Sequence, residues 1–408
     1  MRVNADLHIH GKFSGATSKE MNFVNLAEQA ELKGLDLLGS GDILHSSWLS
    51  EFKETLFPVG NGIYQHPRYK TKFILTVEIE DINRVHHLIL LPDLNSVDEL
   101  RSILTKYCNS LDHDGRPRIN INAEDLVDIV KAVDGIVGPC HAFTPWTSIY
   151  KEFNSISHCY GEGLKNVHFI ELGLSADTKM ADRLKELQNK VFLTNSDAHS
   201  PWPHRIGREF NRFNLKEYSF DSIRKILRSG KGILANYGFD PRLGKYHLTA
   251  CSRCKQRFRL KDALKFNMKC PKCKGLIKKG VEDRINELAD WFEPKHPPDR
   301  PPYHYIPPLA EVIQIALGYS NPYVNEVQRQ WRLLIETFQT EISVLIDVPI
   351  EELKKVTDER IGECIEAFRT GKFSIYPGGG GEYGKIFFNQ VVDVQFYGEA
   401  QKSLMEFE

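Results

Sequence analysis

The stretch NADLHIH at residues 4–10 opens the chain with polar and apolar side chains in alternation. Successive side chains of a β-strand point to opposite faces, so Asp6, His8 and His10 would share one face and the apolar residues the other. Two imidazoles close together at one strand end can bind the same metal cluster. The stretch therefore predicts a strand that carries a metal site.

A second pair with the same spacing lies about 190 residues later, in NSDAH at residues 195–199. Asp197 and His199 follow the apolar run VFLT (191–194), so they would also share a face at a strand end. Other ligand-type residues stand at the ends of further apolar runs, namely Asp42, Glu78, His86, His87, His141 and Glu171.

The first ~240 residues alternate short apolar runs with helix-like segments, a pattern typical of parallel βαβ units. The apolar runs lie at 35–39, 73–79, 87–91, 135–138, 167–172 and 191–194, and the helix-like segments at 22–33, 96–107, 123–133 and 177–189. In parallel sheets and barrels, functional side chains gather where the strands end. The scattered histidines and carboxylates are therefore expected in one site.

This pattern closely resembles the PHP domain family of metal-dependent phosphoesterases over roughly residues 1–210. The resemblance implies an α/β fold with a distorted (βα)7 barrel and a multinuclear metal centre. Its metal ligands would be His8, His10, Asp42, His45, Glu78, His87, His141, Glu171, Asp197 and His199.

Two positions depart from the family pattern or stay ambiguous. The histidine that normally follows Asp42 directly is Ile43 here, and His45 is taken as its replacement. Of the adjacent His86 and His87, we favour His87 because the apolar run follows it directly, while His86 remains the alternative.

The ligand types fit phosphoester hydrolysis. Imidazole suits zinc, carboxylates can bridge two ions, and paired metals stabilise both oxygens of an in-line displacement. We expect two or three divalent ions, Zn²⁺ with Mg²⁺ or Mn²⁺ as alternatives, and catalytic roles for Asp197, Glu78 and His199.

Four cysteines, arranged as CxxC-x15-CxxC, predict a structural Zn²⁺ ribbon with the ligands Cys251, Cys254, Cys270 and Cys273. Residues 241–281 contain thirteen Lys/Arg and one acid, so the overall net charge of -1 conceals a strongly basic segment. This segment predicts a DNA-binding surface that includes Lys255, Arg257 and Arg259, and the alternative is a merely solubilising charged face.

Residues 293–308 contain seven prolines and predict an extended linker. Helix-like segments follow at about 308–317, 322–346, 349–355 and 358–369. The later stretch 379–385 matches G-x4-G-K, but Ile386 replaces the Ser or Thr of a nucleotide-binding loop, so a turn between strands is favoured over a loop that meets DNA phosphates. We expect three domains: a PHP domain at 1–240, a zinc ribbon at 241–285, and a linker with a mainly helical domain at 286–408.

This order of modules resembles the endonuclease Q family. The resemblance implies a DNA repair endonuclease that cuts 5′ of a deaminated base (uracil, hypoxanthine, xanthine) or an abasic site. Protein partners stay open, with a sliding clamp as one candidate. An extruded base would enter a pocket near the metals. Candidate pocket residues are Phe143, Trp146 and Trp202, and candidate DNA-binding residues nearby are Arg205 and Arg208.

Two other functions stay open from the sequence. One is a PHP-type phosphatase or exonuclease acting on small phosphoesters or oligonucleotides, which would have little use for the basic ribbon. The other is a DNA-binding protein without catalysis, which the nearly full ligand set disfavours. We expect a cytoplasmic protein with no membrane partner, because the sequence shows neither an apolar signal core nor an apolar run of ~20 residues.

Overall fold

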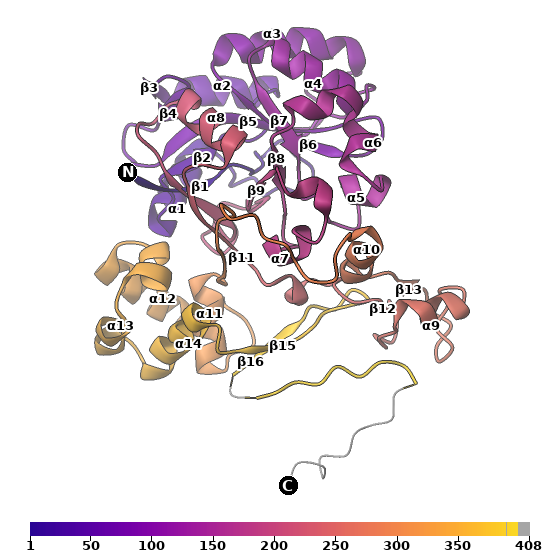
Figure 1. The fold of residues 1–408 in the computed structure, drawn as a ribbon. Coiled ribbons are helices and arrows are strands. Elements are labelled where there is room, and N and C mark those ends of the chain that lie inside the picture. The colour runs from indigo at the N-terminus through magenta and orange to yellow at the C-terminus, as the bar shows by residue number, and fades with distance from the viewer. Residues whose placement is uncertain (389, 399–408) are drawn as a thin grey trace.

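The computed structural model describes residues 1–388 and 390–398 (Figure 1). Its centre is a distorted barrel of seven strands: β1 (Arg2–Asp6), β2 (Leu37–Gly39), β5 (Lys72–Glu80), β6 (His86–Leu91), β7 (Ile136–Pro139), β8 (Phe169–Glu171) and β9 (Val191–Leu193). The ring closes beyond β1, where the Asp197 N–H donates to the His8 carbonyl at 3.0 Å. The expected barrel is thereby confirmed.

Strand β6 departs from the expected parallel order. It pairs antiparallel with both β5 and β7, because only five residues connect β5 to β6 and they form a hairpin. The start of β6 therefore lies at the edge where the other barrel strands end. In the hairpin register His86 faces Glu80 and His87 faces Ile79, which puts the two histidines on opposite faces.

Helices cover the outside of the barrel (Figure 1). The longer ones are α1 (Phe23–Lys33), α2 (Ser46–Thr55), α3 (Leu94–Leu104), α4 (Ala123–Ala132) and α8 (Phe220–Ser229), and short ones are α5 (Ile149–Glu152), α6 (Ile156–Tyr160) and α7 (Thr178–Ala181). Asn22, Asp93, Asn122 and Ser219 cap four of the longer helices with side-chain oxygens. The helix expected over 177–189 is limited to α7 and a 3₁₀ turn (Lys185–Leu187), because the chain turns at Asp182, whose buried carboxylate binds residues of the proline-rich segment.

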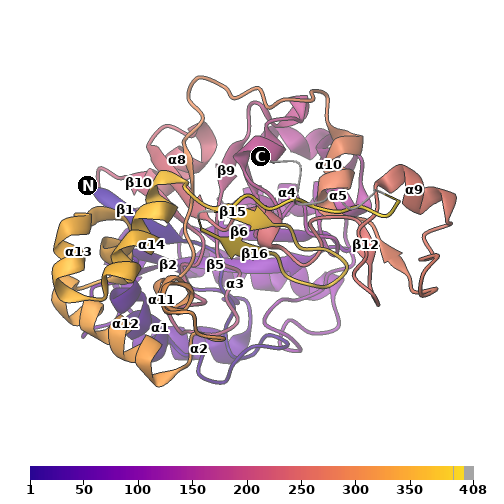
Figure 2. The ribbon, with the colours of Figure 1, turned by 90° about the horizontal axis from the view of Figure 1, so that it is seen from below.

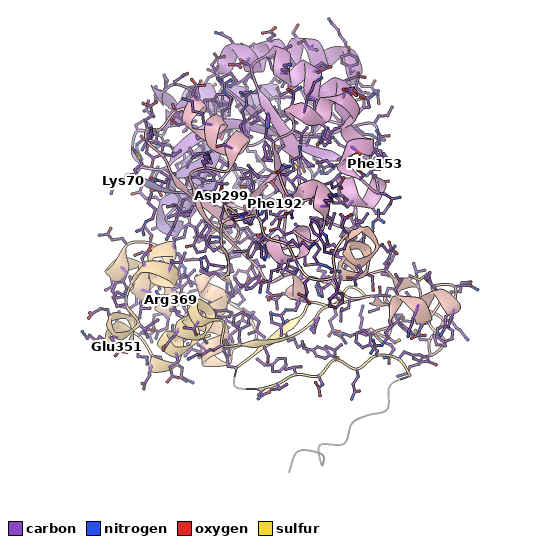
Figure 3. The ribbon with its side chains drawn as sticks, in the orientation of Figure 1. Lys70, Phe153, Phe192, Asp299, Glu351 and Arg369 are labelled. Carbon is purple, nitrogen blue, oxygen red and sulfur yellow. The ribbon has the colours of Figure 1, made fainter. Side chains whose placement is uncertain are left out.

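The proline-rich segment is part of the barrel unit rather than a free linker. Its strand β14 (Tyr303–Tyr305) pairs in parallel with β11 (Ile233–Gly238), which reaches β1 through β10 (Phe210–Asn214). Arg300 donates to Asp182 at 2.8 Å and its guanidinium lies 3.7 Å from the centre of the Phe192 ring. Figure 3 labels Phe192 and Asp299, the residue that precedes Arg300. On the far side, β3 (Phe57–Gly60) and β4 (Ile63–Gln65) extend the sheet from β5.

The cysteine-rich segment forms a small unit beside the barrel. It contains β12 (Ala250–Cys251), α9 (Leu260–Lys265) and β13 (Ile277–Lys278), and helix α10 (Val281–Leu288) follows. Arg284 of α10 donates to the carbonyls of Tyr150 at 2.8 Å and Phe153 at 3.0 Å. The ribbon is thereby fastened to the barrel near α5.

The C-terminal helices α11 (Leu309–Leu317), α12 (Asn325–Phe338), α13 (Ile350–Val356) and α14 (Glu359–Thr370) form a second body beside α1 (Figure 2). The helix expected over 322–346 breaks at Gln339, whose φ is 73°, and resumes as a π-helical turn (Ser343–Asp347). A buried ion pair of 2.6 Å between Lys33 and Glu341 joins this body to the barrel. None of the helices in the described part of the chain has both the length and the apolarity needed to traverse a bilayer.

The glycine-rich stretch lies between β15 (Ser374–Tyr376) and β16 (Lys385–Phe387), which confirms the expected turn between strands. It lies against the ribbon, where the Leu248 N–H donates to the Gly378 carbonyl at 3.0 Å and the Gly381 N–H to the Lys245 carbonyl at 2.9 Å. The C-terminal region is therefore mainly helical, and its helices are followed by a hairpin that holds the ribbon.

Candidate metal centre

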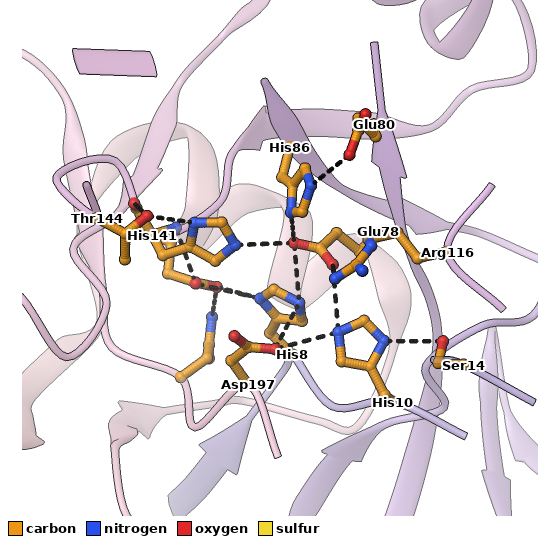
Figure 4. Close-up of polar contacts among 12 residues, drawn as sticks. His8, His10, Ser14, Glu78, Glu80, His86, Arg116, His141, Thr144 and Asp197 are labelled. Carbon is orange, nitrogen blue, oxygen red and sulfur yellow. Dashed lines mark hydrogen bonds and ion pairs between the residues drawn. The ribbon is translucent and has the colours of Figure 1, made fainter. Parts of the chain in front are cut away.

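The barrel strands bring predicted ligands from both ends of the PHP sequence into one buried cluster (Figure 4). His10 Nε2 lies 3.1 Å and His8 Nε2 lies 3.8 Å from Asp197 Oδ1. All three atoms are buried, and none finds a hydrogen-bond partner among the described residues. Buried polar atoms normally have a partner, so an unpartnered trio of ligand atoms fits a bound cation.

Glu78 occupies the middle of the cluster. One of its oxygens lies 2.8 Å from His86 Nδ1 and 2.9 Å from His141 Nε2, and the other lies 3.2 Å from His10 Nε2. The potential ligand atoms fall into two neighbouring groups. One consists of His8, His10 and Asp197, and the other of Glu78, His86 and His141. A carboxylate between two such groups is placed to bridge two metal ions.

Asp42 and Glu171, both expected as metal ligands, lie beside the Nδ1 atoms of His10 and His8 rather than beside their Nε2 atoms. Asp42 is 3.0 Å from His10 Nδ1 and accepts a hydrogen bond from the Ser14 hydroxyl, and Glu171 is 2.9 Å from His8 Nδ1 and accepts from the Asn195 amide. Their oxygens are thus occupied within the protein. Carboxylates in this position fix the ring so that the other nitrogen, Nε2, faces the cluster.

The structure places His86 rather than His87 beside Glu78, so the position favours the alternative over the residue that we preferred. His87 lies on the other face of β6, where its Nδ1 is 2.7 Å from the Tyr160 hydroxyl and its Nε2 is 3.2 Å from Asp81. His86 Nε2 contacts Glu80 at 3.1 Å, which leaves Nδ1 as the nitrogen that faces Glu78.

His199 lies at the rim of the cluster, whereas His45 lies apart from it. The His199 ring is 4.5 Å from that of His10, and its Nδ1 is 2.9 Å from the Asp197 carbonyl. His45 precedes α2 and stacks on Phe13 at 4.4 Å, and the contacts of residues 1–388 and 390–398 do not include one from it to the metal cluster. The ligand role of His45 stays a prediction, because its ring lies apart from the cluster while its buried Nδ1 has no hydrogen-bond partner among the described residues.

The electrostatics of the cluster favour cations. Burial alone would lower the pKa of His8 and His10, but the surrounding carboxylates raise both well above the usual histidine value. Burial would likewise raise the pKa of Asp197, yet the imidazoles of His10 and His8 close to its carboxylate hold that pKa well below its usual range. The site thus carries a negative potential that divalent ions would satisfy.

The four ribbon cysteines form a second candidate metal site. Cys251 Sγ lies 3.4 Å from Cys273 Sγ, Cys254 Sγ lies 3.6 Å from Cys270 Sγ, and all four sulfurs are within 4.8 Å of one another. Phe258 and Ile277 pack against them as a small core. Four converging thiols with no open position fit a closed, structural ion.

The basic residues proposed to contact DNA differ in access. Arg257 is 6% exposed, and its guanidinium donates to the Tyr376 hydroxyl and the Pro377 carbonyl, both at 2.7 Å, so it holds the C-terminal hairpin. Lys255 also reaches the hairpin, through the Gly380 carbonyl at 3.0 Å. Arg259 and Arg205 are exposed, and the half-buried Arg208 donates to the Ser196 carbonyl at 3.0 Å.

Two of the three proposed pocket aromatics share a cavity. Phe143 is buried against Tyr150 and Trp146 is half exposed against Tyr246, and both line a cavity of about 570 Å³ between the barrel and the ribbon. Trp202 is exposed and lies elsewhere, in the loop after His199.

Two residues near the cluster escaped the sequence reasoning. Arg116 donates to Glu78 at 3.3 Å, and Cys140 lies beside His8 and Glu78. Asp6, which was expected on the same face as His8 and His10, accepts from the backbone N–H of Ser196 and so steadies the turn that carries Asp197. Arg116 comes from an irregular loop and gave no periodic signal. Cys140 directly precedes the predicted ligand His141 at a strand end, so the sequence could have indicated that it lies near the metal site.

Comparisons with known proteins agree with this arrangement. Residues 308–372 match the family described as the MJ0043 C-terminal domain. The chain is 51% identical over 274 residues, 66% of its length, to the uncharacterized protein MJ0043 of Methanocaldococcus jannaschii, and it spans about a third of that relative (34%).

Two solved structures match nearly the whole chain. One is the lesion-specific endonuclease PfuEndoQ from Pyrococcus furiosus, with 48% identity, a TM-score of 0.91 and coverage of 95% of this chain and 96% of that one. The other is an endonuclease Q complex with a 27-mer duplex that has an abasic lesion at the active site, with 48% identity, a TM-score of 0.88 and coverage of 95% and 97%. Because this similarity extends over the barrel, the ribbon and the helical body together, the chain belongs to the endonuclease Q family.

Proposed function

We propose that this protein is a metal-dependent DNA repair endonuclease that hydrolyses the phosphodiester 5′ of a deaminated base (uracil, hypoxanthine or xanthine) or of an abasic site. The observation that carries the proposal is the full-length similarity to endonuclease Q, one solved form of which holds a duplex with an abasic lesion at its active site. The buried histidine–carboxylate cluster supplies the chemistry such a reaction needs.

In this proposal the cluster holds two or three divalent ions, Zn²⁺ with Mg²⁺ or Mn²⁺ as alternatives. Such ions lower the pKa of water and neutralise charge on the reacting phosphate. The inward-facing atoms belong to His8, His10, Glu78, His86, His141 and Asp197. Asp42, Glu171 and Glu80 keep three of these imidazoles in place through their other ring nitrogens.

Two residues at the rim would act on the substrate itself. Arg116 is half-buried beside Glu78, where its remaining N–H groups can bind a phosphate oxygen. Burial lowers the pKa of His199, so its ring is neutral at pH 7. With Nδ1 facing the Asp197 carbonyl, His199 Nε2 is free to accept a proton from attacking water.

The DNA is proposed to lie across the barrel edge and the zinc ribbon. The exposed Arg205 and Arg259 would contact phosphates, and the ribbon zinc would stabilise the surface that presents its lysines. The cavity between barrel and ribbon, with Phe143, Trp146 and Tyr246 in its wall, is a place where a base taken out of the helix can stack.

The test is cleavage of duplexes that carry one uracil, hypoxanthine, xanthine or abasic site, with undamaged DNA as control and the nick mapped. We expect a single 5′ nick in lesion-containing DNA, dependent on added metal. Asp197→Ala should lose cleavage by at least ~100-fold while keeping DNA binding, because it removes a central ligand. Asp128→Ala, a change of an exposed carboxylate on α4, is the matched control and should cut normally.

Two results would contradict the proposal. One is full cleavage by metal-stripped Asp197→Ala. The other is wild-type protein that leaves every damaged duplex intact but hydrolyses small phosphoesters or single-stranded oligonucleotides, which would favour the phosphatase or exonuclease alternative.

A further inference from the structure

Cys140 lies beside His8 and Glu78 of the metal centre, at the end of β7. It follows β7 directly, and its N–H donates to the His86 carbonyl at 2.9 Å, which continues the β6–β7 pairing by one residue. Its side chain is fully buried and belongs to the same buried cluster as Leu7 and Leu88, below the histidines. The thiol is therefore enclosed between the apolar barrel interior and the polar cluster above it.

The distances around this thiol suit metal ligation. A ligand atom of His8, one of Glu78 and the Cys140 sulfur all lie within 4.8 Å of one another. Ligand atoms of a tetrahedral zinc ion are about 3–4 Å apart, given metal–ligand distances of ~2.0–2.3 Å, so small adjustments complete such a site. His8 Nε2 lies 3.6 Å from Glu78 Oε1, is buried and has no hydrogen-bond partner in the described chain, as expected of an atom that binds a cation.

We propose that the Cys140 thiolate is a further ligand of a metal ion held by His8 and Glu78. The inference rests on the proposed function, since it adds a ligand to the proposed hydrolytic centre. Binding would release the thiol proton to solvent and form one sulfur–metal bond, with no change of oxidation state.

A thiolate ligand makes the two halves of the centre chemically different. Thiolates favour zinc, whereas imidazole and carboxylate oxygens also accept manganese and, for the oxygens, magnesium. The position beside Cys140 should therefore retain zinc tightly. The position formed by His10 and Asp197 offers only nitrogen and oxygen and should exchange its ion more readily.

The alternative is that Cys140 is only a small apolar residue that fills the barrel, as buried cysteines often are. Cys140→Ser keeps the size of the side chain but removes the sulfur, and Cys140→Ala keeps an apolar filler. Cys159 on α6 is also buried and belongs to the outer hydrophobic cluster, so Cys159→Ser is the matched control.

The experiment uses the full-length protein, stripped of metal and reloaded with Co²⁺, and compares near-ultraviolet absorption between variants. Thiolate–cobalt charge-transfer bands from the four ribbon cysteines occur in every variant and cancel in difference spectra. We expect wild type and Cys159→Ser to show an additional thiolate band that both Cys140 variants lack. Zinc affinity of the barrel site should fall at least ~10-fold in Cys140→Ser, the lower end of what loss of a supporting residue costs.

Identical charge-transfer intensity and zinc affinity in wild type and the folded Cys140 variants would overturn the inference. Far-ultraviolet circular dichroism and thermal unfolding identify a variant that fails to fold, and Cys140→Ala then serves in place of Cys140→Ser. The cobalt spectrum does not depend on DNA cleavage. An extra thiolate band in a protein that cuts no lesion would refute the endonuclease proposal alone, whereas cleavage without the band would refute the Cys140 ligand alone.

Discussion

His86 and His87 are neighbours in the sequence with opposite environments, and this contrast gives a test at the level of single residues. His86→Ala removes a side chain that faces Glu78 and His141. We expect it to lower the metal content of the barrel site and to slow cleavage by at least ~10–100-fold. His87→Ala removes contacts to Tyr160 and Asp81, so it should cost about 1–3 kcal/mol of stability and leave metal content unchanged. Plasma mass spectrometry, with the ribbon zinc subtracted, and thermal unfolding measure the two effects.

Equal metal loss in the two variants, or loss only in His87→Ala, would contradict this assignment.

The sequence predicted that His8, His10, Glu78, His141 and Asp197 meet in one site, because strand ends gather such residues. It could not decide between His86 and His87, since the choice depends on the direction of β6 and on the register of a hairpin. It also did not separate the inward-facing residues from Asp42 and Glu171, because orienting and ligating carboxylates are of the same residue type.

The glycine-rich loop between β15 and β16 gives a test at the level of structural elements. Gly380 has a φ of +62°, and a Cβ built there would lie 2.4 Å from the Cys251 carbonyl oxygen. Gly318, with a φ of +74° and nothing within 4 Å of such a Cβ, is the matched control. Gly318→Ala should cost about 1–2 kcal/mol from backbone strain alone. Gly380→Ala should cost a further ~1–3 kcal/mol from the clash and should speed zinc release from the ribbon to a chelator.

Thermal unfolding and chelator-driven zinc release measure this difference, and equal values for the two variants would show that the loop does not hold the ribbon.

The positions of the helices could largely be predicted from the sequence. Five of the expected helices, α1, α4, α11, α13 and α14, begin and end within about two residues of the predicted limits. What failed were features set by long-range contacts, such as β14, where prolines predicted a linker but residues 303–305 join the sheet.

At the scale of the whole molecule, three regions that the sequence separated prove to be joined. The proline-rich segment is part of the barrel sheet, a buried Lys33–Glu341 pair connects barrel and helical body, and Arg257 ties the ribbon to the C-terminal hairpin. Sequence alone gave the order of these regions and the basic character of the ribbon. It could not give the contacts between them, because the sequence does not distinguish a lysine that forms a buried ion pair from a lysine that faces solvent.

The basic face of the ribbon is therefore expected to come from its exposed lysines and not from Arg257. Replacing Lys269, Lys272 and Lys274 with glutamine removes three exposed charges from a segment with thirteen basic residues and one acid. If each meets a phosphate, the slope of log K against log[salt] should fall by about 2–3, since each contact contributes ~0.9. Preference for damaged over undamaged duplex should stay unchanged, because phosphate contacts carry no information about the base.

A triple variant of exposed lysines elsewhere on the barrel, Lys131, Lys225 and Lys231, is the matched control. Arg224 of α8 pairs with Asp134 after α4 at 2.6 Å, which places this control set together at one side of the barrel, and α4 and α8 lie away from the ribbon in Figure 1. Fluorescence anisotropy over a range of salt concentrations gives both slopes. A flattened slope in the control set, or an unchanged slope in the ribbon set, would mean that DNA lies on another face and that the ribbon charges serve solubility.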